Sequence, residues 1–156
     1  MTLADALTEM GNRLGIGELD LDQNGGCLLA FDDDLLVDIE KAEDEPGFYF
    51  TATVGSAPHA GREVVFAELL EANLQGRGTG RASLALDGDL DEIVLNRYID
   101  RDDIDVDMLE QELETFLTVL QAWKQRYSAG EIGSLRGPAA ANSEVPLRPG
   151  AGIIRG

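Results

Sequence analysis

Hydrophobic residues recur at helical spacing in three segments of the chain, where apolar positions lie three and four residues apart. These segments span residues 2–14, 62–74 and 107–128. Asp107 and Glu110 are suitably spaced to form a capping pair at the start of the last segment. The middle segment is apolar over most of its circumference, so we expect it to bury more than one side.

Five other segments predict β-strands; among them, residues 35–40 alternate between apolar and polar sides, and residues 48–54 are rich in aromatic and β-branched side chains. These segments span residues 27–31, 35–40, 48–54, 82–87 and 92–99. In the second of them, Val37 and Ile39 share one side, whereas Leu36 lies on the opposite side with Asp38. Short acidic links predict hairpins between the first two strands and between the last two.

The predicted order is α-β-β-β-α-β-β-α. Because most strand links are of hairpin length, we expect an α+β fold of two layers with a mainly antiparallel sheet. One domain should cover residues 1–128. Residues 129–156 are rich in glycine and proline, and we predict a disordered tail there. The sequence GRGTGR at 76–81 predicts a flexible loop.

The chain is strongly acidic, with a formal net charge of −18 over 156 residues. The tail carries three arginines and two glutamates, so the acidity belongs to the first 128 residues. This sign argues against binding to nucleic acids or to anionic membranes. It favours solubility and rapid encounter with basic partners.

The single cysteine, Cys27, cannot form an intramolecular disulfide, which is natural in a reducing compartment. It occupies a core-facing strand position and is expected to be a small buried hydrophobic residue. The N-terminal sequence lacks the basic and apolar regions of a signal peptide. No apolar run approaches the length of a membrane span.

Three patterns resemble ligand sites but lack essential parts of them. The run from Asp20 to Gly25 matches half of an EF-hand loop, yet its twelfth position is Phe31 rather than glutamate, so we expect a turn. The glycines of 76–81 follow a helix and lack the lysine of a phosphate loop. His59 is the only histidine. We therefore predict no catalytic residue, metal site or cofactor.

The ordered set of segments resembles the class I type III secretion chaperones, also called the Tir-chaperone or CesT-like family. The likeness is carried by the first helix running into LGIGELDLDQNGGCLLAFDDDLLVDIE, by FYFTATVG with the following helix, by the hairpin ASLALDGDLDEIVLNRYI, and by the closing helix DMLEQELETFLTVLQAWKQ. Together these stretches cover about residues 1–128.

The resemblance implies a non-enzymatic homodimer in the bacterial cytoplasm. Such proteins bind a segment near the N-terminus of a secreted effector, keep it soluble, partly unfolded and competent for export, and help to present it to the secretion ATPase. We expect the effector to bind in an extended form, through an added strand and apolar grooves.

Within this interpretation, we place the effector grooves around the first helix and the first three strands. The candidate effector-binding residues are Leu7, Met10, Leu14, Leu28, Leu36 and Tyr49. Leu28 and Leu36 are the strongest candidates, because they lie opposite the main apolar side of their strands. The candidate dimer-interface residues are Val65, Leu69, Leu70, Leu74, Leu84 and Val94.

Two other functions remain open at this point. The same fold could serve as an acidic protein-binding or regulatory module that works without an effector. A small enzyme or metal protein is the other alternative, although its chemistry finds no specific support among the residues.

Overall fold

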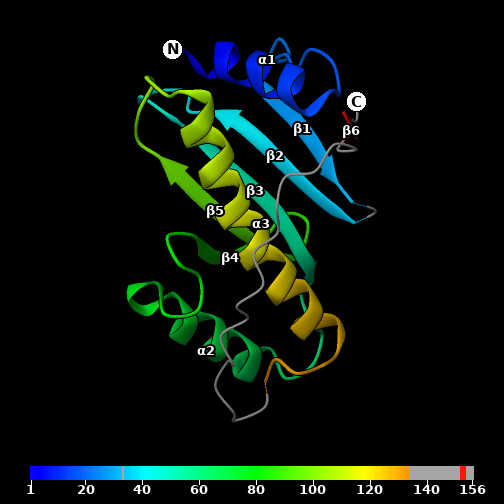
Figure 1. Cartoon of the computed structure of the whole chain (residues 1–156). Coiled ribbons are helices and arrows are strands. Elements are labelled where there is room, and N and C mark those ends of the chain that lie inside the picture. The colour runs from blue at the N-terminus through cyan, green and yellow to red at the C-terminus, as the bar shows by residue number, and fades with distance from the viewer. Residues whose placement is uncertain (33, 134–151, 154–156) are drawn as a thin grey trace.

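The computed structural model describes residues 1–32, 34–133 and 152–153 (Figure 1). Its helices and strands follow the predicted order. The helices are α1 (Leu3–Leu14), α2 (Arg62–Asn73) and α3 (Val106–Ser128), with a short 3-10 turn η1 (Leu74–Gly76). The strands are β1 (Gly26–Phe31), β2 (Leu35–Lys41), β3 (Phe48–Ser56), β4 (Ser83–Asp87), β5 (Glu92–Ile99) and β6 (Gly152–Ile153).

The strands form one sheet in the order β4-β5-β3-β2-β1-β6, and each neighbouring pair is antiparallel. Two hairpins, β1–β2 and β4–β5, form where the sequence predicts them. The β3–β5 pairing joins the two halves of the sheet and places β4 at one edge. The prediction of an α+β fold with an antiparallel sheet is thus confirmed.

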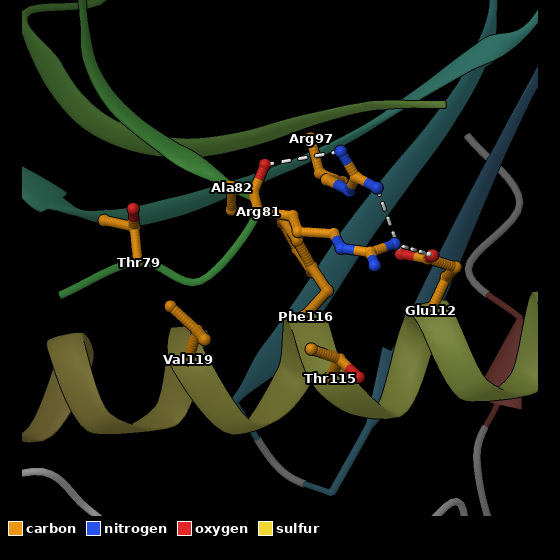
Figure 2. A pocket seen from close by; sticks show the side chains of 8 residues that line it. All are labelled: Thr79, Arg81, Ala82, Arg97, Glu112, Thr115, Phe116 and Val119. Atoms are coloured by element: carbon orange, nitrogen blue, oxygen red, sulfur yellow. Dashed lines mark hydrogen bonds and ion pairs between the residues drawn. The ribbon is translucent and has the colours of Figure 1, made fainter. Parts of the chain in front are cut away.

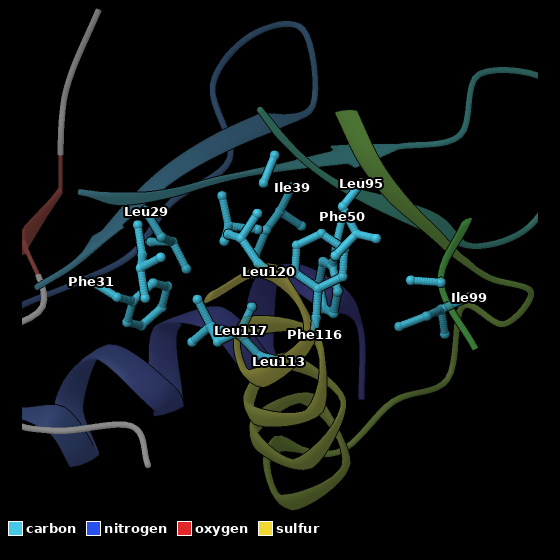
Figure 3. Packing of buried hydrophobic residues seen from close by; sticks show 14 of the residues in the cluster. Leu29, Phe31, Ile39, Phe50, Leu95, Ile99, Leu113, Phe116, Leu117 and Leu120 are labelled. Atoms are coloured by element: carbon cyan, nitrogen blue, oxygen red, sulfur yellow. The ribbon is translucent and has the colours of Figure 1, made fainter. Parts of the chain in front are cut away.

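The core lies between one face of the sheet and the helices, as Figures 1 and 3 show. Alternate residues of β3, such as Phe48 and Phe50, are buried on this inner face. The ring of Phe50 meets the ring of Phe116 from α3 edge-on, with 5.6 Å between centroids. The buried leucines of α3 extend this contact along the sheet. Helix α3 therefore supplies the main cover of the inner face.

The opposite, outer face of the sheet is not covered by any helix in the described part of the chain. Its residues are those of the other alternation, including Leu28 on β1, Leu36 on β2 and Tyr49 on β3. A single helical layer thus leaves one sheet face available to a partner.

Helix α3 begins differently from the prediction. Asp105 is its N-cap residue and accepts a hydrogen bond from the backbone N–H of Met108. The predicted capping pair, Asp107 and Glu110, instead lies near Arg13 of α1, with 2.5 Å between the Arg13 and Asp107 side chains. The expected capping pair was wrong because an earlier aspartate caps the helix, which leaves these acids to hold α1 against α3.

The 76–81 loop is anchored rather than flexible, so that prediction was also wrong. Thr79 is fully buried, and the indole N–H of Trp123 donates to the carbonyl of Gly78 over 2.8 Å. A Cβ on Gly78 would lie 2.8 Å from the Cβ of Ala72. Glycine is present here because the loop packs closely against α2.

Part of the predicted tail contacts the body of the domain. Ile132 is buried, and the backbone N–H of Gly133 donates to the carboxylate of Glu68. Strand β6 pairs with β1 through two residues. The prediction of disorder for the remaining residues, 134–151 and 154–156, falls outside the described residues.

Gly11 provides a test of how α1 is held. A Cβ at this buried helical position would lie 2.1 Å from the backbone oxygen of Gly17. We expect Gly11→Ala to lower the free energy of unfolding by about 1–3 kcal/mol, because the backbone at residue 17 must move. Urea denaturation measures this change. Gly88→Ala is the control, since a Cβ there meets nothing within 4 Å. Equal stability of the two variants would contradict the proposed close contact.

Candidate functional site

The candidate residues on α1 lie inside the chain's own core. Leu7 and Met10 are completely buried, and Leu14 is half-buried against the same core. The reason is that the apolar stripe of an amphipathic helix packs against its own domain first. Leu7 and Met10 therefore offer no surface to a partner in this arrangement.

Leu28 and Leu36 lie diagonally across the β1–β2 pair on the outer face of the sheet. Ala30 lies opposite Leu36 in the β1–β2 register, and Leu28 is two residues before Ala30 on the same face. Leu36 is 45% exposed, and the other two are half-buried. We call Leu28, Ala30 and Leu36 the β1–β2 apolar patch.

Tyr49 lies on the same face but apart from this patch. It is opposite Glu40 on one side and Tyr98 on the other. The rings of Tyr49 and Tyr98 stack with 4.8 Å between centroids, and the Tyr49 hydroxyl donates to Glu45 over 2.9 Å. Tyr49 thus belongs to an aromatic pair on the β3–β5 side of the outer face.

Acidic side chains border the β1–β2 apolar patch. Asp38 lies opposite Leu28, and burial together with the nearby charges of Glu40 and Asp22 raises the pKa of its carboxyl. Burial, reinforced by neighbouring aspartates, also raises the pKa of the Cys27 thiol to about 11. Cys27 is buried, as predicted, and its thiol is protonated at neutral pH. A basic group placed here would relieve the repulsion among the carboxylates.

The candidate dimer residues do not share one surface. Val65, Leu69 and Leu84 are buried within the core. Val94 lies opposite Thr53 and Ala85 on the outer face of the sheet.

By contrast, Leu70 is 70% exposed and Leu74 is 55% exposed. Their spacing of four residues places them on one side of α2 and its η1 extension. We call these two residues the α2 apolar ridge.

A small pocket beneath β5 is lined by residues from the 79–82 loop, β5 and α3 (Figure 2). Glu112 accepts from both Arg81 and Arg97 at 3.4 Å. The cavity measures about 10 Å³, which is room for about one water molecule. The Thr79 hydroxyl and Arg97 Nε are buried there with no hydrogen-bond partner in the described residues. The cavity fits a bridging water and is too small for an organic ligand.

A larger, open hollow of about 390 Å³ lies where the second half of α3 meets the β1–β2 hairpin. Its lining mixes apolar side chains such as Leu35 with polar ones, and Lys124 donates to the backbone oxygen of Asp34 over 3.0 Å. Among the described residues, Asp34 is the one carboxylate in this lining, and these residues form no pair of carboxylates there.

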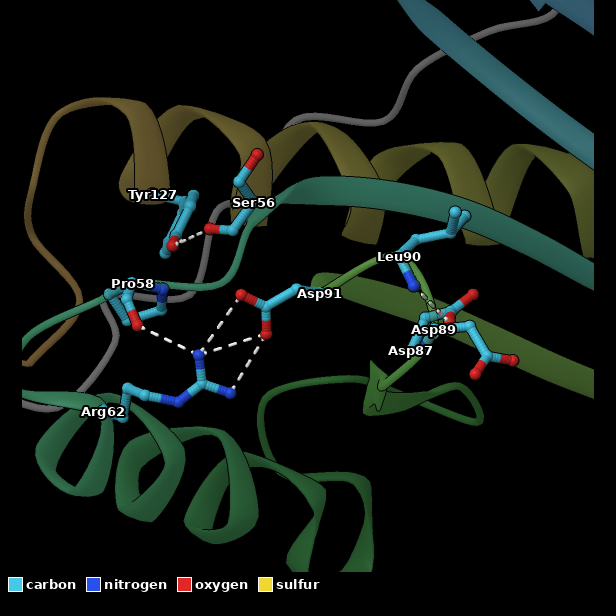
Figure 4. Close-up of polar contacts among 8 residues, drawn as sticks. All are labelled: Ser56, Pro58, Arg62, Asp87, Asp89, Leu90, Asp91 and Tyr127. Atoms are coloured by element: carbon cyan, nitrogen blue, oxygen red, sulfur yellow. Dashed lines mark hydrogen bonds and ion pairs between the residues drawn. The ribbon is translucent and has the colours of Figure 1, made fainter.

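The acidic turns have structural roles. Asp22 accepts from the backbone N–H groups of Asn24 and Gly26, which forms the predicted turn before β1. In the β4–β5 turn, Asp87 accepts from the backbone of Asp89 and Leu90 (Figure 4).

Asp91 at the end of this turn is bound by Arg62 of α2 through contacts of 3.1 Å (Figure 4).

No group of three or more metal-binding side chains occurs within residues 1–32 and 34–133.

The family follows from a comparison with family models. The model of the Tir chaperone protein (CesT) family matches residues 5–124 of this chain, which include β1 to β5 and most of α3. The chain belongs to the Tir chaperone family. The resemblance inferred from the sequence is thereby confirmed. A comparison with curated proteins found no match.

Solved structures agree with this family assignment at the level of the fold. A chain of the ExsC–ExsE complex superposes with a TM-score of 0.67 at 20% identity, covering 80% of this chain and 96% of that chain. A chain of the HopA1–SchA chaperone–effector complex gives 0.64 at 16% identity, with coverages of 78% and 91%. A chain of the ExoU–SpcU complex of the Pseudomonas aeruginosa type III secretion system superposes with a TM-score of 0.57 at 21% identity, covering 80% of this chain and 93% of that chain.

Within the part of this Tir-chaperone family member that the structure describes, no helix is long and apolar enough to cross a membrane. The two edges of its sheet differ in how they are covered. At the β4 edge, the Asn73 amide donates to the carbonyl of Leu84 over 2.9 Å and accepts from its N–H over 2.8 Å. At the opposite edge, β6 pairs with Leu29 and Ala30, two of the six residues of β1, within the described part of the chain. A side chain thus covers one residue of β4, whereas a two-residue strand covers part of β1.

Sequence reasoning missed Asn73 and β6. Asn73 ends α2 and gives no periodic signal of its own, although a half-buried asparagine at a helix end does suggest a hydrogen-bonding role. A strand of two residues is too short to show alternation. Both features depend on the tertiary arrangement.

Replacement of Asn73 tests the closure of the β4 edge. We expect Asn73→Ala to lower the free energy of unfolding by about 1–3 kcal/mol, because both backbone groups of Leu84 lose their partner. Thermal and urea denaturation would detect this. The exposed Asn24→Ala change is the matched control and should be close to neutral. If both alanine variants are as stable as the wild type, the Asn73 amide does not contribute to the edge.

Proposed function

We propose that this protein is a non-enzymatic cytoplasmic chaperone that binds an extended segment from the N-terminal region of a type III secretion effector, here called the client. The observation that carries the proposal is the combination of a β1 edge that β6 covers over two residue pairs in the described part of the chain with the adjoining β1–β2 apolar patch. Membership of the Tir chaperone family supports it, and the related folds come from complexes described as chaperone–effector pairs or as part of a secretion system.

Recognition combines backbone and side-chain contacts. A client strand added to β1 satisfies the edge N–H and C=O groups, which gives affinity with little dependence on sequence. Alternate client side chains then fall on the outer face, where Leu28 and Leu36 accept apolar groups. Burial of about 1,000–3,000 Å² on coupled folding would offset an ordering cost of about 2–5 kcal/mol. A client held in this way stays extended, as a narrow export channel requires.

Charge selects the client further. The acidic border of the patch, with Asp38 and Glu40 on the outer face, favours a client strand that carries Lys or Arg. The net charge of −18 also keeps exposed apolar surface from associating without a client. The acidic surface therefore serves both recognition and solubility.

Dimerisation uses the α2 apolar ridge in this proposal. Leu70 and Leu74 are exposed leucines at helical spacing, and a two-fold axis would place each ridge against its copy. The residues beneath the ridge, Val65 and Leu69, support it from the core. A dimer would present two β1 edges to one client chain, which raises affinity through a second, intramolecular contact. Delivery to the secretion ATPase would follow from the same complex.

Co-expression with the effector encoded next to the chaperone tests the proposal. We expect a complex that survives size-exclusion chromatography and a client that is soluble only when the chaperone is present. Absence of any complex would favour the alternative, a regulatory module of the same fold. Calorimetry with calcium or nucleotides tests the enzyme or metal alternative, which stoichiometric heat would support.

The role of the β1–β2 apolar patch in client binding can be tested by introducing charged side chains into it. We expect the double change Leu28→Asp and Leu36→Asp to weaken client binding at least about tenfold, or about 1.4 kcal/mol, because two carboxylates would be buried against the client. Fluorescence anisotropy with a labelled client segment measures the affinity. Leu90→Asp is the control, since Leu90 is 68% exposed in the β4–β5 turn. Wild-type affinity in a folded double variant would refute the assignment of the patch.

The role of the α2 apolar ridge in dimerisation is tested by measuring the molecular mass of a variant. We expect the double change Leu70→Asp and Leu74→Asp to convert a dimer into a folded monomer, because like charges would face each other across the axis. Light scattering after size exclusion gives the mass, and circular dichroism checks the fold. Leu90→Asp again serves as the control and should remain dimeric. A double variant that stays dimeric would show that another surface joins the subunits.

A further inference from the structure

The chain's own segment Gly152–Ile153 occupies part of the edge that the proposed function assigns to the client. It forms β6, in which Ile153 lies opposite Leu29 and Gly152 lies opposite Ala30. The pairing is antiparallel and involves the middle of β1, next to the β1–β2 apolar patch. Figure 1 shows β6 beside β1 at the end of the sheet near α1. An added strand would have to use the same backbone groups.

This contact is the shortest strand pairing in the described sheet. It joins two residue pairs, whereas β1 pairs with β2 through six. The family match ends at residue 124, so β6 also lies outside the part of the chain that matches the family model. A short pairing is easily replaced by a longer one, since each additional pair adds backbone and side-chain contacts.

We propose that the 152–153 segment is an intramolecular competitor of the client: it covers the β1 edge in the free protein and leaves when the client strand pairs. The competition rests on the proposed function, whereas the occupancy of the edge does not. An uncovered sheet edge is a template for aggregation, and native proteins shield such edges. The segment provides this shield at the one edge that must also open.

The local sequence suits this role. Ile153 and Ile154 are β-branched residues, which favour strands, within a tail otherwise rich in glycine, proline and alanine. Pro149 and Gly150 precede them in the sequence and are residue types that strands disfavour. The local sequence therefore combines strand-forming residues with residues that disfavour a longer strand, as a weak competitor requires.

The effect of this competition on the affinity for the client can be predicted. A ligand that binds only the open state has its apparent affinity reduced by the open fraction. If the segment covers the edge in about 70–90% of molecules, removing the pairing should tighten client binding about three- to tenfold. A stronger pairing would prevent client capture, and a weaker one would leave the edge unprotected.

Occupancy is tested without a client by hydrogen exchange on the full-length protein. The variant carries Gly152→Pro and Ile153→Pro, which remove both N–H donors of the segment. The control carries Ala140→Pro and Ala141→Pro, two prolines in the same tail. We expect amides of β1 to exchange faster only in the first variant, while those of β2 and β3 are unchanged. A synthetic peptide of residues 147–156 added to that variant should restore protection, and the same peptide with both prolines should not.

Two results of this experiment would overturn occupancy by the chain's own segment. One is equal protection of β1 in the wild type and both proline variants. The other is protection that rises with protein concentration, because the segment would then come from another copy.

The competition is tested with a labelled client segment and the same three proteins. We expect the variant at 152 and 153 to bind about three- to tenfold more tightly than the wild type and the control at 140 and 141. Equal affinities would refute competition and leave the proposed function standing. If none of the three proteins binds the client segment, both the proposed function and the competition are refuted. The hydrogen-exchange experiment would then still decide whether the 152–153 segment covers β1.

Discussion

The packing of α3 across one face of the sheet is the contact on which the rest of this structure depends. Phe116 and the neighbouring leucines of α3 meet Phe50 and its inner-face neighbours, and this layer holds β2, β3 and β5 in place. Because one long helix covers the inner face, the outer face carries no cover from helices in the described residues. The surfaces available to partners are a direct consequence of this one-sided arrangement.

The backbone groups at the two edges of the sheet are covered in different ways. At β4, the amide of Asn73 satisfies both backbone groups of Leu84. At β1, a segment far along the chain pairs through two residues. The side chain covers one residue of β4 from a helix, whereas the cover of β1 comes from a strand of two residues. Under the proposed competition, the β1 cover is the one that gives way to a client.

Much of the fold could be predicted because local patterns agree with the tertiary structure. Alternation marks strands such as β2, aromatic and β-branched residues mark β3, and helical spacing marks the helices. The position of β5 between β3 and β4 could not be read in the same way. It depends on pairing between strands that α2 and β4 separate along the chain.

The candidate site was predicted only in part, for a related reason. Leu28 and Leu36 could be identified because they break the phase of their strands, so a domain core does not account for them. Leu7 and Met10 keep the phase of α1, and such residues pack inward. For α2, an apolar circumference could not distinguish Leu69, which is buried, from Leu70, which is exposed. A sequence pattern identifies a surface residue when an apolar side chain falls on the polar side of its element. It cannot do so when every side of the element is apolar.

The acidity of the domain links these surfaces. Asp38 stands beside Leu28, where partial burial and the charges of Glu40 and Asp22 raise the pKa of its carboxyl. Ionisation of such a group disfavours the free folded state at neutral pH, because its folded pKa exceeds the unfolded value and the unfolded chain releases its proton more readily. Burial is the larger cause of this shift, and repulsion by Glu40 and Asp22 adds to it. Under the proposed function, a client that brings a positive charge to this position would offset the repulsive part of the penalty, so the acidic border favours a basic strand.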